Sequence, residues 1–184
     1  MRKLFSLLLI LTGSLSVTAQ EFQTDHIILN EKFHLNGGVR ASMGGRSRIV
    51  VPLPIPVEPS VVYYAFSTSG NPNELKTINL VAQATNFIYP GIGQAAVTAL
   101  SFVAPQGTGG VVNFYLMPAS ETQAFLAKTQ FRYVMNASRE NFREGAICVR
   151  NDLRGQEWYL GIMNPSATQS VDVTVDAIAI KAAQ

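Results

Sequence analysis

The chain of 184 residues has one cysteine and two histidines, which limits the chemistry it can carry. A single cysteine cannot form a disulfide within the chain. A zinc site needs three or four ligands, and His26 and His34 are far from Cys148 in the sequence. We therefore predict no metal and no cofactor. We interpret both histidines as isolated strand residues, and Cys148 as a buried, inert thiol.

Motifs for catalysis are also missing. The sequence contains no G-x-S-x-G motif, and Gly91-Ile92-Gly93 is too short for a phosphate loop and lacks a following lysine. Asp172 and Asp176 are four residues apart on one predicted strand, about 13 Å along it, so we expect solvated carboxylates rather than a pair that shares a proton. We therefore predict no catalytic residue and favour a protein that is not an enzyme. A carboxylate-dependent hydrolase using Asp172, Asp176 or Glu144 stays the alternative, because such enzymes carry no local motif.

Charge is absent from the forty-four residues between Thr77 and Ser120. Before this stretch, Asn71-Pro72-Asn73-Glu74 has the form of a helix start, and apolar residues then recur at helical spacing up to Pro90. Residues 94–102 favour a second, shorter helix. The sequence therefore predicts an αα-hairpin insert, at about residues 72–104, between two strands.

Three roles for this uncharged insert stay open. It could cover one face of a sheet, associate with a second copy of the chain, or insert into lipid. Each arm is shorter than the roughly twenty apolar residues that span a bilayer, and Asn79, Gln83, Asn86 and Gln94 interrupt the apolar run. We expect burial within the monomer first, self-association second and membrane insertion third.

The N-terminus has the pattern of a signal peptide. Arg2-Lys3 precedes an apolar run from Leu4 to Leu11, and Val17-Thr18-Ala19 has small residues suited to cleavage before Gln20. We expect residues 1–19 to be removed and the protein to be exported, to the periplasm or the extracellular space. The 14 basic and 12 acidic residues then become 12 of each, since the signal peptide holds Arg2, Lys3 and no acid. A chain with zero net charge has no general attraction for nucleic acid.

Short alternating stretches separated by turn residues dominate the remaining 165 residues, 20–184. This pattern predicts a single, mainly β domain, an antiparallel β-sandwich of about eight strands with jelly-roll-like architecture and the helical insert. We expect Pro52, Pro54, Pro56 and Pro59 to lie on an extended edge or crossover segment rather than in a central strand, because proline cannot donate to a ladder. A short helix is expected near Ser120–Gln123, and a charged loop at Asn136–Gly145. The expected strands are 27–29, 31–35, 39–43, 46–53, 61–66, 111–117, 131–134, 146–150, 157–163 and 170–180.

Two groups of residues are candidates for ligand binding. The polar cluster of the charged loop is one, since loops on a sandwich commonly carry recognition. The aromatic pair on the strand 157–163 is the other, because its members point to opposite faces, and an exposed aromatic ring beside polar groups suits a sugar or peptide. The candidate residues are Arg139, Glu140, Asn141, Arg143, Glu144, Trp158 and Tyr159.

The C-terminal third carries a family resemblance. Gln156-Glu157-Trp158-Tyr159-Leu160-Gly161-Ile162-Met163-Asn164-Pro165 and Val171-Asp172-Val173-Thr174-Val175 resemble the last strands of bacterial pre-peptidase C-terminal domains. Those are small, secreted, jelly-roll-like sandwiches. The resemblance covers the strands and not the insert, and it implies an accessory extracellular module without transferring any functional residue.

These observations together predict a secreted or periplasmic, non-catalytic binding or structural module. We expect its partner to be a protein or a carbohydrate, with a homo-oligomer as an open alternative and no nucleic acid. A membrane-active protein that uses the uncharged hairpin is the remaining alternative.

Overall fold

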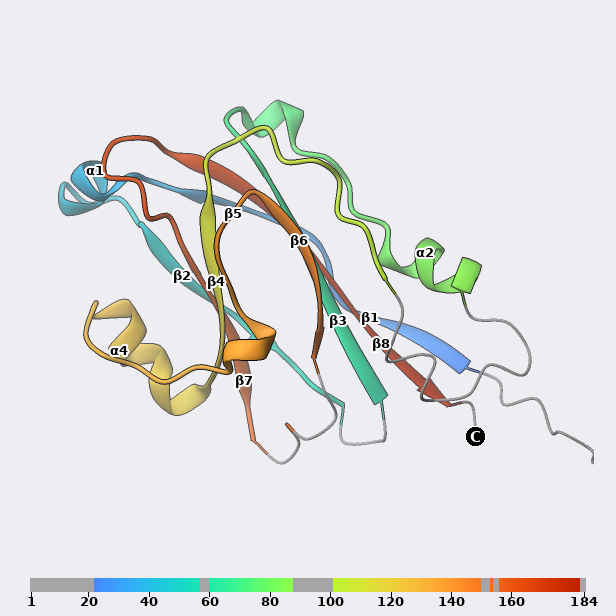
Figure 1. Ribbon diagram of the computed structural model, residues 1–184. Coiled ribbons are helices and arrows are strands. Elements are labelled where there is room, and N and C mark those ends of the chain that lie inside the picture. Colours follow the sequence, from blue (N-terminus) through green and yellow to red (C-terminus); the bar gives the residue numbers. More distant parts are fainter. Residues whose placement is uncertain (1–21, 57–59, 88–100, 150–152, 154–155, 183–184) are drawn as a thin grey trace, which may run out of the picture.

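A computed structural model of the chain describes residues 22–56, 60–87, 101–149, 153 and 156–182. The described residues form two four-stranded antiparallel sheets that pack face to face (Figure 1). The predicted mainly β sandwich is confirmed. The first sheet has the strand order β1-β8-β3-β6, and the second has the order β2-β7-β4-β5. The strands are β1 (Phe22–Leu35), β2 (Arg48–Leu53), β3 (Ser60–Ser69), β4 (Val112–Pro118), β5 (Arg139–Phe142), β6 (Glu144–Val149), β7 (Trp158–Met163) and β8 (Val171–Ala182).

The main core lies between the two sheets and follows the alternation of the strands. Along β8, the small apolar residues from Val171 to Ala179 at every second position point inward, as their spacing predicts. Phe66 of β3 stacks on Phe114 of β4 with ring centroids 4.0 Å apart, so the sheets are joined through aromatic contacts at the centre. Both rings are fully buried.

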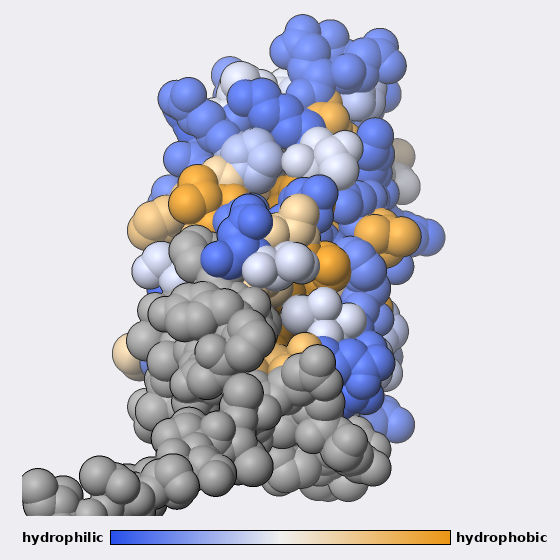
Figure 2. All heavy atoms as spheres, turned by 90° about the vertical axis from the view of Figure 1, so that its right-hand side faces the viewer, coloured by the Kyte–Doolittle hydropathy of each residue, from blue (hydrophilic) through white to orange (hydrophobic). Residues whose placement is uncertain are grey.

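The uncharged insert covers the outer face of the first sheet, as expected of a buried segment. Ile78 and Leu80 from one arm and Phe102 from the other pack on the outward side chains of β3 and β8 and are buried. Figure 1 shows both arms running along this sheet, with α2 (Leu80–Phe87) in the first. Figure 2, which looks at the side that carries α2, shows apolar side chains as separate spots among hydrophilic ones.

The insert is not the helical hairpin that the sequence predicts. Asn71 does cap a helix, by accepting a hydrogen bond from the Asn73 amide, but that helix is the single 3-10 turn η1 (Pro72–Glu74). Residues 75–79 are not helical, and α2 begins only at Leu80, where the Asn79 side chain accepts from the Ala82 amide. Most of the second predicted helix falls in residues 88–100, outside the described residues, and its last two residues are not helical.

Three other sequence predictions are wrong. Residues expected to form a return strand at 39–43 lie in α1 (Gly38–Ser42), because the Gly38 and Val39 amides bond to the carbonyls of Ser166 and Ala167 instead of to a strand. The segment 131–134 is not a strand and makes one ladder-like bond, from the Val134 amide to the Leu116 carbonyl. The segment expected to be a charged loop contains the strand β5, and the 3-10 turn η3 (Met135–Ala137) precedes that strand.

The outer face of the second sheet carries a smaller, aromatic core. The 3-10 turn η2 (Ala119–Glu121) and the helix α4 (Thr122–Leu126) follow β4 and place Phe125 over it. Phe131 contacts both Tyr115 and Phe125 edge-on, at centroid distances of 5.2 and 5.1 Å. The short helix is therefore where the sequence predicts it. Within the described part of the chain, no helix has the length and apolar character that a bilayer span requires.

Candidate functional site

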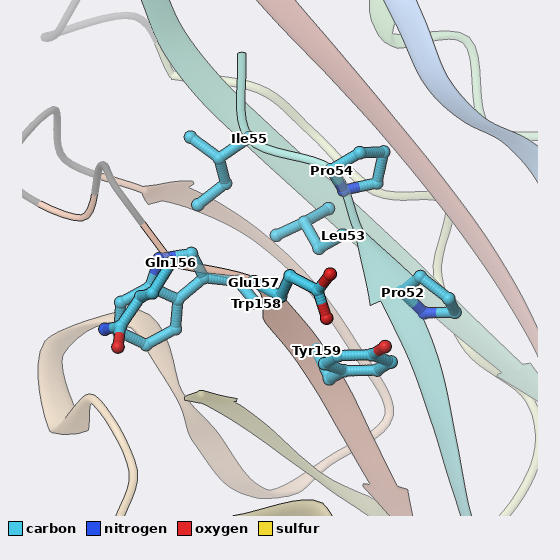
Figure 3. Close-up of a pocket in the computed structure, with 8 residues that line it drawn as sticks. All are labelled: Pro52, Leu53, Pro54, Ile55, Gln156, Glu157, Trp158 and Tyr159. Atoms are coloured by element: carbon cyan, nitrogen blue, oxygen red, sulfur yellow. The ribbon is translucent and has the colours of Figure 1, made fainter. Parts of the chain in front are cut away.

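A pocket opens at the end of the sandwich where β2 ends and β7 begins (Figure 3). Its volume is about 350 Å³. The described residues that line it come from two short segments, and two of them, Trp158 and Tyr159, are among the residues predicted from the sequence. The lining residues are Pro52, Leu53, Pro54, Ile55, Gln156, Glu157, Trp158 and Tyr159.

Strand register determines which side chains reach the pocket. Leu53 pairs with Trp158 and Pro52 pairs with Tyr159. Because successive side chains of a strand alternate between faces, Leu53 and Trp158 point into the main core, and Pro52 and Tyr159 point outward. The predicted split of the aromatic pair is therefore confirmed: Trp158 is 6 % exposed, and its indole N–H donates to the Leu153 carbonyl, whereas Tyr159 is half-buried.

Prolines flank the pocket because β2 is an edge strand. Among the described strands, none pairs with the outer side of β2, and proline is tolerated there since no ladder donor is lost. The edge position predicted for Pro52 is thus confirmed, and Pro54 lies just beyond the strand. These rings give the pocket rigid apolar walls on the side opposite Gln156 and Glu157.

The polar groups of the pocket are exposed and available to a ligand. Gln156 and Glu157 are both exposed and line the pocket, and Figure 3 shows the Glu157 carboxylate near the Tyr159 ring. A carboxylate accepts hydrogen bonds, and an amide both donates and accepts them. The pocket therefore combines an aromatic surface with hydrogen-bonding groups, a composition suited to a polar ligand with apolar faces.

The predicted polar cluster lies elsewhere. Arg139 pairs with Phe114 on β4, whereas Trp158 pairs with Pro118. Four residues of strand correspond to about 13 Å, so the cluster and the pocket are at opposite ends of the second sheet. The structure does not bring the seven candidate residues together.

Within that cluster, most side chains fasten the corner where the chain crosses from β5 in the second sheet to β6 in the first. Glu140 accepts a hydrogen bond from the Tyr133 hydroxyl at 3.3 Å. The backbone amide of Asn141 donates to the side-chain oxygen of Asn113. Glu144 accepts from the Gly107 amide at 3.0 Å, and Arg139 donates to the Ser138 carbonyl. Arg143 is exposed.

Burial changes the pKa of one tyrosine at this corner. Burial raises the pKa of Tyr115 to about 12, against the opposing hydrogen bond from Asn113. The Tyr115 hydroxyl accepts from the Asn113 amide group at 3.0 Å. Tyr115 is therefore neutral at physiological pH, and it belongs to a structural network at this corner that includes Tyr133 and the Glu140 carboxylate.

The histidines and aspartates are placed differently from their prediction. Asp172 and Asp176 are buried rather than solvated, and each has a histidine of β1 beside it. The His34 and Asp172 side chains are 2.8 Å apart, and His26 and Asp176 are 3.6 Å apart. The pairs arise because β1 and β8 are antiparallel neighbours. This pairing joins residues about 140 positions apart, so no local sequence pattern could have indicated it.

Desolvation dominates the titration of the more deeply buried aspartate. Burial raises the pKa of Asp176, and the hydrogen bond from the Leu80 amide and the charge of His26 only partly oppose it. The Leu80 amide donates to Asp176 Oδ2 at 3.2 Å, while Oδ1 has no hydrogen-bond partner among the described residues. Across the described ranges, no three His, Cys, Asp or Glu side chains are grouped so that they could hold a metal ion.

Sequence reasoning missed Gln156 and Glu157, which the resemblance motif contains but whose place in a pocket depends on strand pairing. It also missed the approach of Pro52 and Pro54 to Tyr159. No family model and no curated protein matches this chain.

Proposed function

We propose that the chain is an exported, non-catalytic binding module whose pocket between β2 and β7 takes a carbohydrate. The observation that supports this most directly is the pairing of the Tyr159 ring with exposed Glu157 and Gln156 in one cavity. A sugar presents apolar C–H faces to an aromatic ring and hydroxyl groups to carboxylates and amides.

The proposed architecture is that of the jelly-roll-like pre-peptidase C-terminal domains, which the strands from Gln156 onward resemble. Those modules accompany other domains outside the cell, so the predicted signal peptide and the resemblance support the same location. Residues 1–19 lie outside the described residues. Mass spectrometry of the protein from its host is expected to give an N-terminus near Gln20, and an intact Met1 on a cytoplasmic protein contradicts export.

The binding proposal is tested by screening the mature chain on a carbohydrate array and measuring the affinity of any glycan found by calorimetry. Glu157→Gln keeps the size of an exposed side chain and removes its charge, and we expect it to weaken binding about tenfold, the loss of one charge-assisted hydrogen bond. Glu31→Gln is the matched control, since Glu31 is exposed on β1 of the other sheet. Equal affinities of both variants and the wild type for the same glycan contradict the proposal.

A second candidate, an extended peptide, is favoured by the free edge of β2. An added strand could hydrogen-bond to that edge, and its side chain could enter the pocket at the end of β2. A peptide library that yields binders, together with no response to any glycan, identifies this function instead.

The hydrolase alternative finds less support. Glycoside hydrolases use two carboxyl groups about 5 to 10 Å apart across the scissile bond, and Glu157 is the one carboxylate among the described lining residues. Glu144 is bound to the Gly107 amide, and Asp172 and Asp176 are buried beside His34 and His26. We therefore expect no turnover of glycoside, ester or peptide substrates. Turnover that is lost on mutation of Glu144, Asp172 or Asp176 supports the enzyme.

A further inference from the structure

Three cationic side chains meet at the other end of β2 and β7, between α1 and α4 on the left of Figure 1. Two adjoining pockets there, of about 310 and 220 Å³, share Ser47, Arg48 and Lys128, and Arg46 lines the smaller one. We name this pair of pockets the cationic hollow. The remaining described lining residues are Gly38, Ala41, Gly45, Leu126, Met163, Asn164, Pro165, Ser166 and Ala167, none of them acidic.

Among the described residues, no carboxylate forms an ion pair with the cations of the hollow. The ion pairs of the described residues involve His26, His34, Arg132 and Lys181, and none involves Arg46, Arg48 or Lys128. The carboxylate of the neighbouring helical segment, Glu121, is bound by Arg132 at 2.8 Å. The chain is neutral after loss of the predicted signal peptide, so this is a local concentration of positive charge rather than a share of a general one.

Arg48 is held in place. Its Nη1 donates to the Phe125 carbonyl at 2.6 Å, and its guanidinium carbon lies 5.1 Å from the centre of the buried Phe125 ring. The Lys128 amide donates to the same carbonyl at 3.2 Å, and Lys128 adopts a positive φ of 61°. One backbone carbonyl therefore brings Arg48 and Lys128 together, and little side-chain freedom of Arg48 remains to be lost on binding.

The Arg48 guanidinium is also partly desolvated. Burial lowers the pKa of Arg48 from its usual range, and no carboxylate of the described residues forms an ion pair with it. An anion in the hollow would offset this desolvation, because charge-assisted hydrogen bonds to a guanidinium are about twice as strong as neutral ones.

We propose that the cationic hollow binds a tetrahedral oxyanion, a phosphate or a sulfate, either free or as an ester on a sugar-sized molecule. Arginine forms paired hydrogen bonds to phosphate and sulfate oxygens, and lysine supplies a point charge. Met163, Pro165 and Ala167 provide an apolar wall for the body of an ester. Arg48 is five strand steps, about 17 Å, from Leu53 in the pocket that contains Tyr159, and the hollow does not depend on that pocket.

The test is calorimetry of the mature chain with inorganic phosphate, inorganic sulfate, glucose 6-phosphate and glucose, at an ionic strength matched with chloride. We expect saturable binding of the oxyanions and no binding of glucose. Binding of inorganic phosphate alone identifies a free anion, and tighter binding of glucose 6-phosphate identifies an ester. Both results support the proposal, and responses no larger than that to chloride overturn it.

Variants of the cationic residues test whether the oxyanion binds in the hollow. Arg46→Gln and Lys128→Asn change exposed side chains, and asparagine tolerates the positive φ of Lys128, so both are expected to fold. Each variant should raise the dissociation constant for the oxyanion about tenfold. Arg143→Gln removes an exposed charge between β5 and β6, at the edge of the second sheet opposite β2, and should leave the dissociation constant unchanged. Wild-type affinity in both hollow variants, or an equal loss in Arg143→Gln, overturns the proposal.

Discussion

Asn30 and Ile78 are joined by two hydrogen bonds across 48 positions of sequence. The Asn30 side chain donates to the Ile78 carbonyl at 2.8 Å and accepts from the Ile78 amide at 2.6 Å. Asn30 has a positive φ of 45° and lies where the pairing of β1 with β8 is shifted in register. The irregularity in β1 thus turns the Asn30 side chain toward the insert, and this side chain holds the insert on the sheet together with Asp176, which accepts from the Leu80 amide.

Replacing Asn30 by glycine should therefore detach this contact without straining the backbone. We expect Asn30→Gly to lower the free energy of unfolding by about 2 to 3 kcal/mol, because two hydrogen bonds are lost. Asn141→Gly is the control: Asn141 has a φ of 60°, and its side chain is exposed. Urea unfolding followed by circular dichroism measures both, and equal stabilities of the two variants contradict this role of Asn30.

Substitutions of Ile78 test whether the insert covers the outer face of the first sheet. Its side chain is 1 % exposed, so Ile78→Asp buries an unpaired charge and should cost about 3 to 5 kcal/mol. Ile78→Val, which removes one methylene, should cost about 1 kcal/mol. Thermal unfolding and sedimentation give stability and oligomeric state. A variant Ile78→Asp that keeps both but no longer binds liposomes would show that the insert is a membrane element.

Close backbone contact fixes the second arm of the insert. A Cβ on Gly109 would lie 2.4 Å from the Ser69 carbonyl carbon, whereas a Cβ on Gly110 would have only Val171 near it, at 4.0 Å. Gly109→Ala should therefore force this arm away from β3 and cost about 1 to 3 kcal/mol, with faster hydrogen exchange of the Thr108 amide. Gly110→Ala should leave that exchange rate unchanged. Unchanged, slow exchange of the Thr108 amide in Gly109→Ala would mean that this arm accommodates the added methyl group without moving away from β3.

The buried carboxyl of Asp176 gives a dependence on pH. Because burial raises its pKa in the fold, the folded protein holds this proton more tightly than the unfolded chain. Its contribution to stability is greatest below the unfolded-state pKa and is lost as the pH rises through the folded-state pKa.

Asp176→Asn should for this reason be more stable than the wild type at pH 7 and should approach it near pH 3, where Asp176 is protonated. Asparagine can still accept from the Leu80 amide. Urea unfolding of both proteins from pH 3 to pH 8 gives the difference, and Glu31→Gln, on an exposed residue, should show no such trend. A wild type that is the more stable of the two at pH 7 would show that His26 and the Leu80 amide outweigh desolvation.

Local sequence patterns determined the strands with regular alternation and the position of the prolines. The inward residues of β8 follow from a period of two, and Pro52 had to lie at a sheet edge because it lacks an N–H. The same reasoning found Trp158 and Tyr159 and divided them between two faces, since adjacent strand residues point to opposite sides.

Tertiary contacts decided the rest. Gly38 and Val39 are helical because residues 166 and 167 supply their hydrogen-bond acceptors. Asn71 caps only one 3-10 turn, and the non-helical residues that follow include Ile78, which is bonded to Asn30 of β1. Asp176 is buried beside His26, and Arg48 beside Phe125, through the pairing and packing of segments far apart in sequence. Alternation assigns a residue to a face of its strand, but the register and the neighbouring segment decide what covers that face.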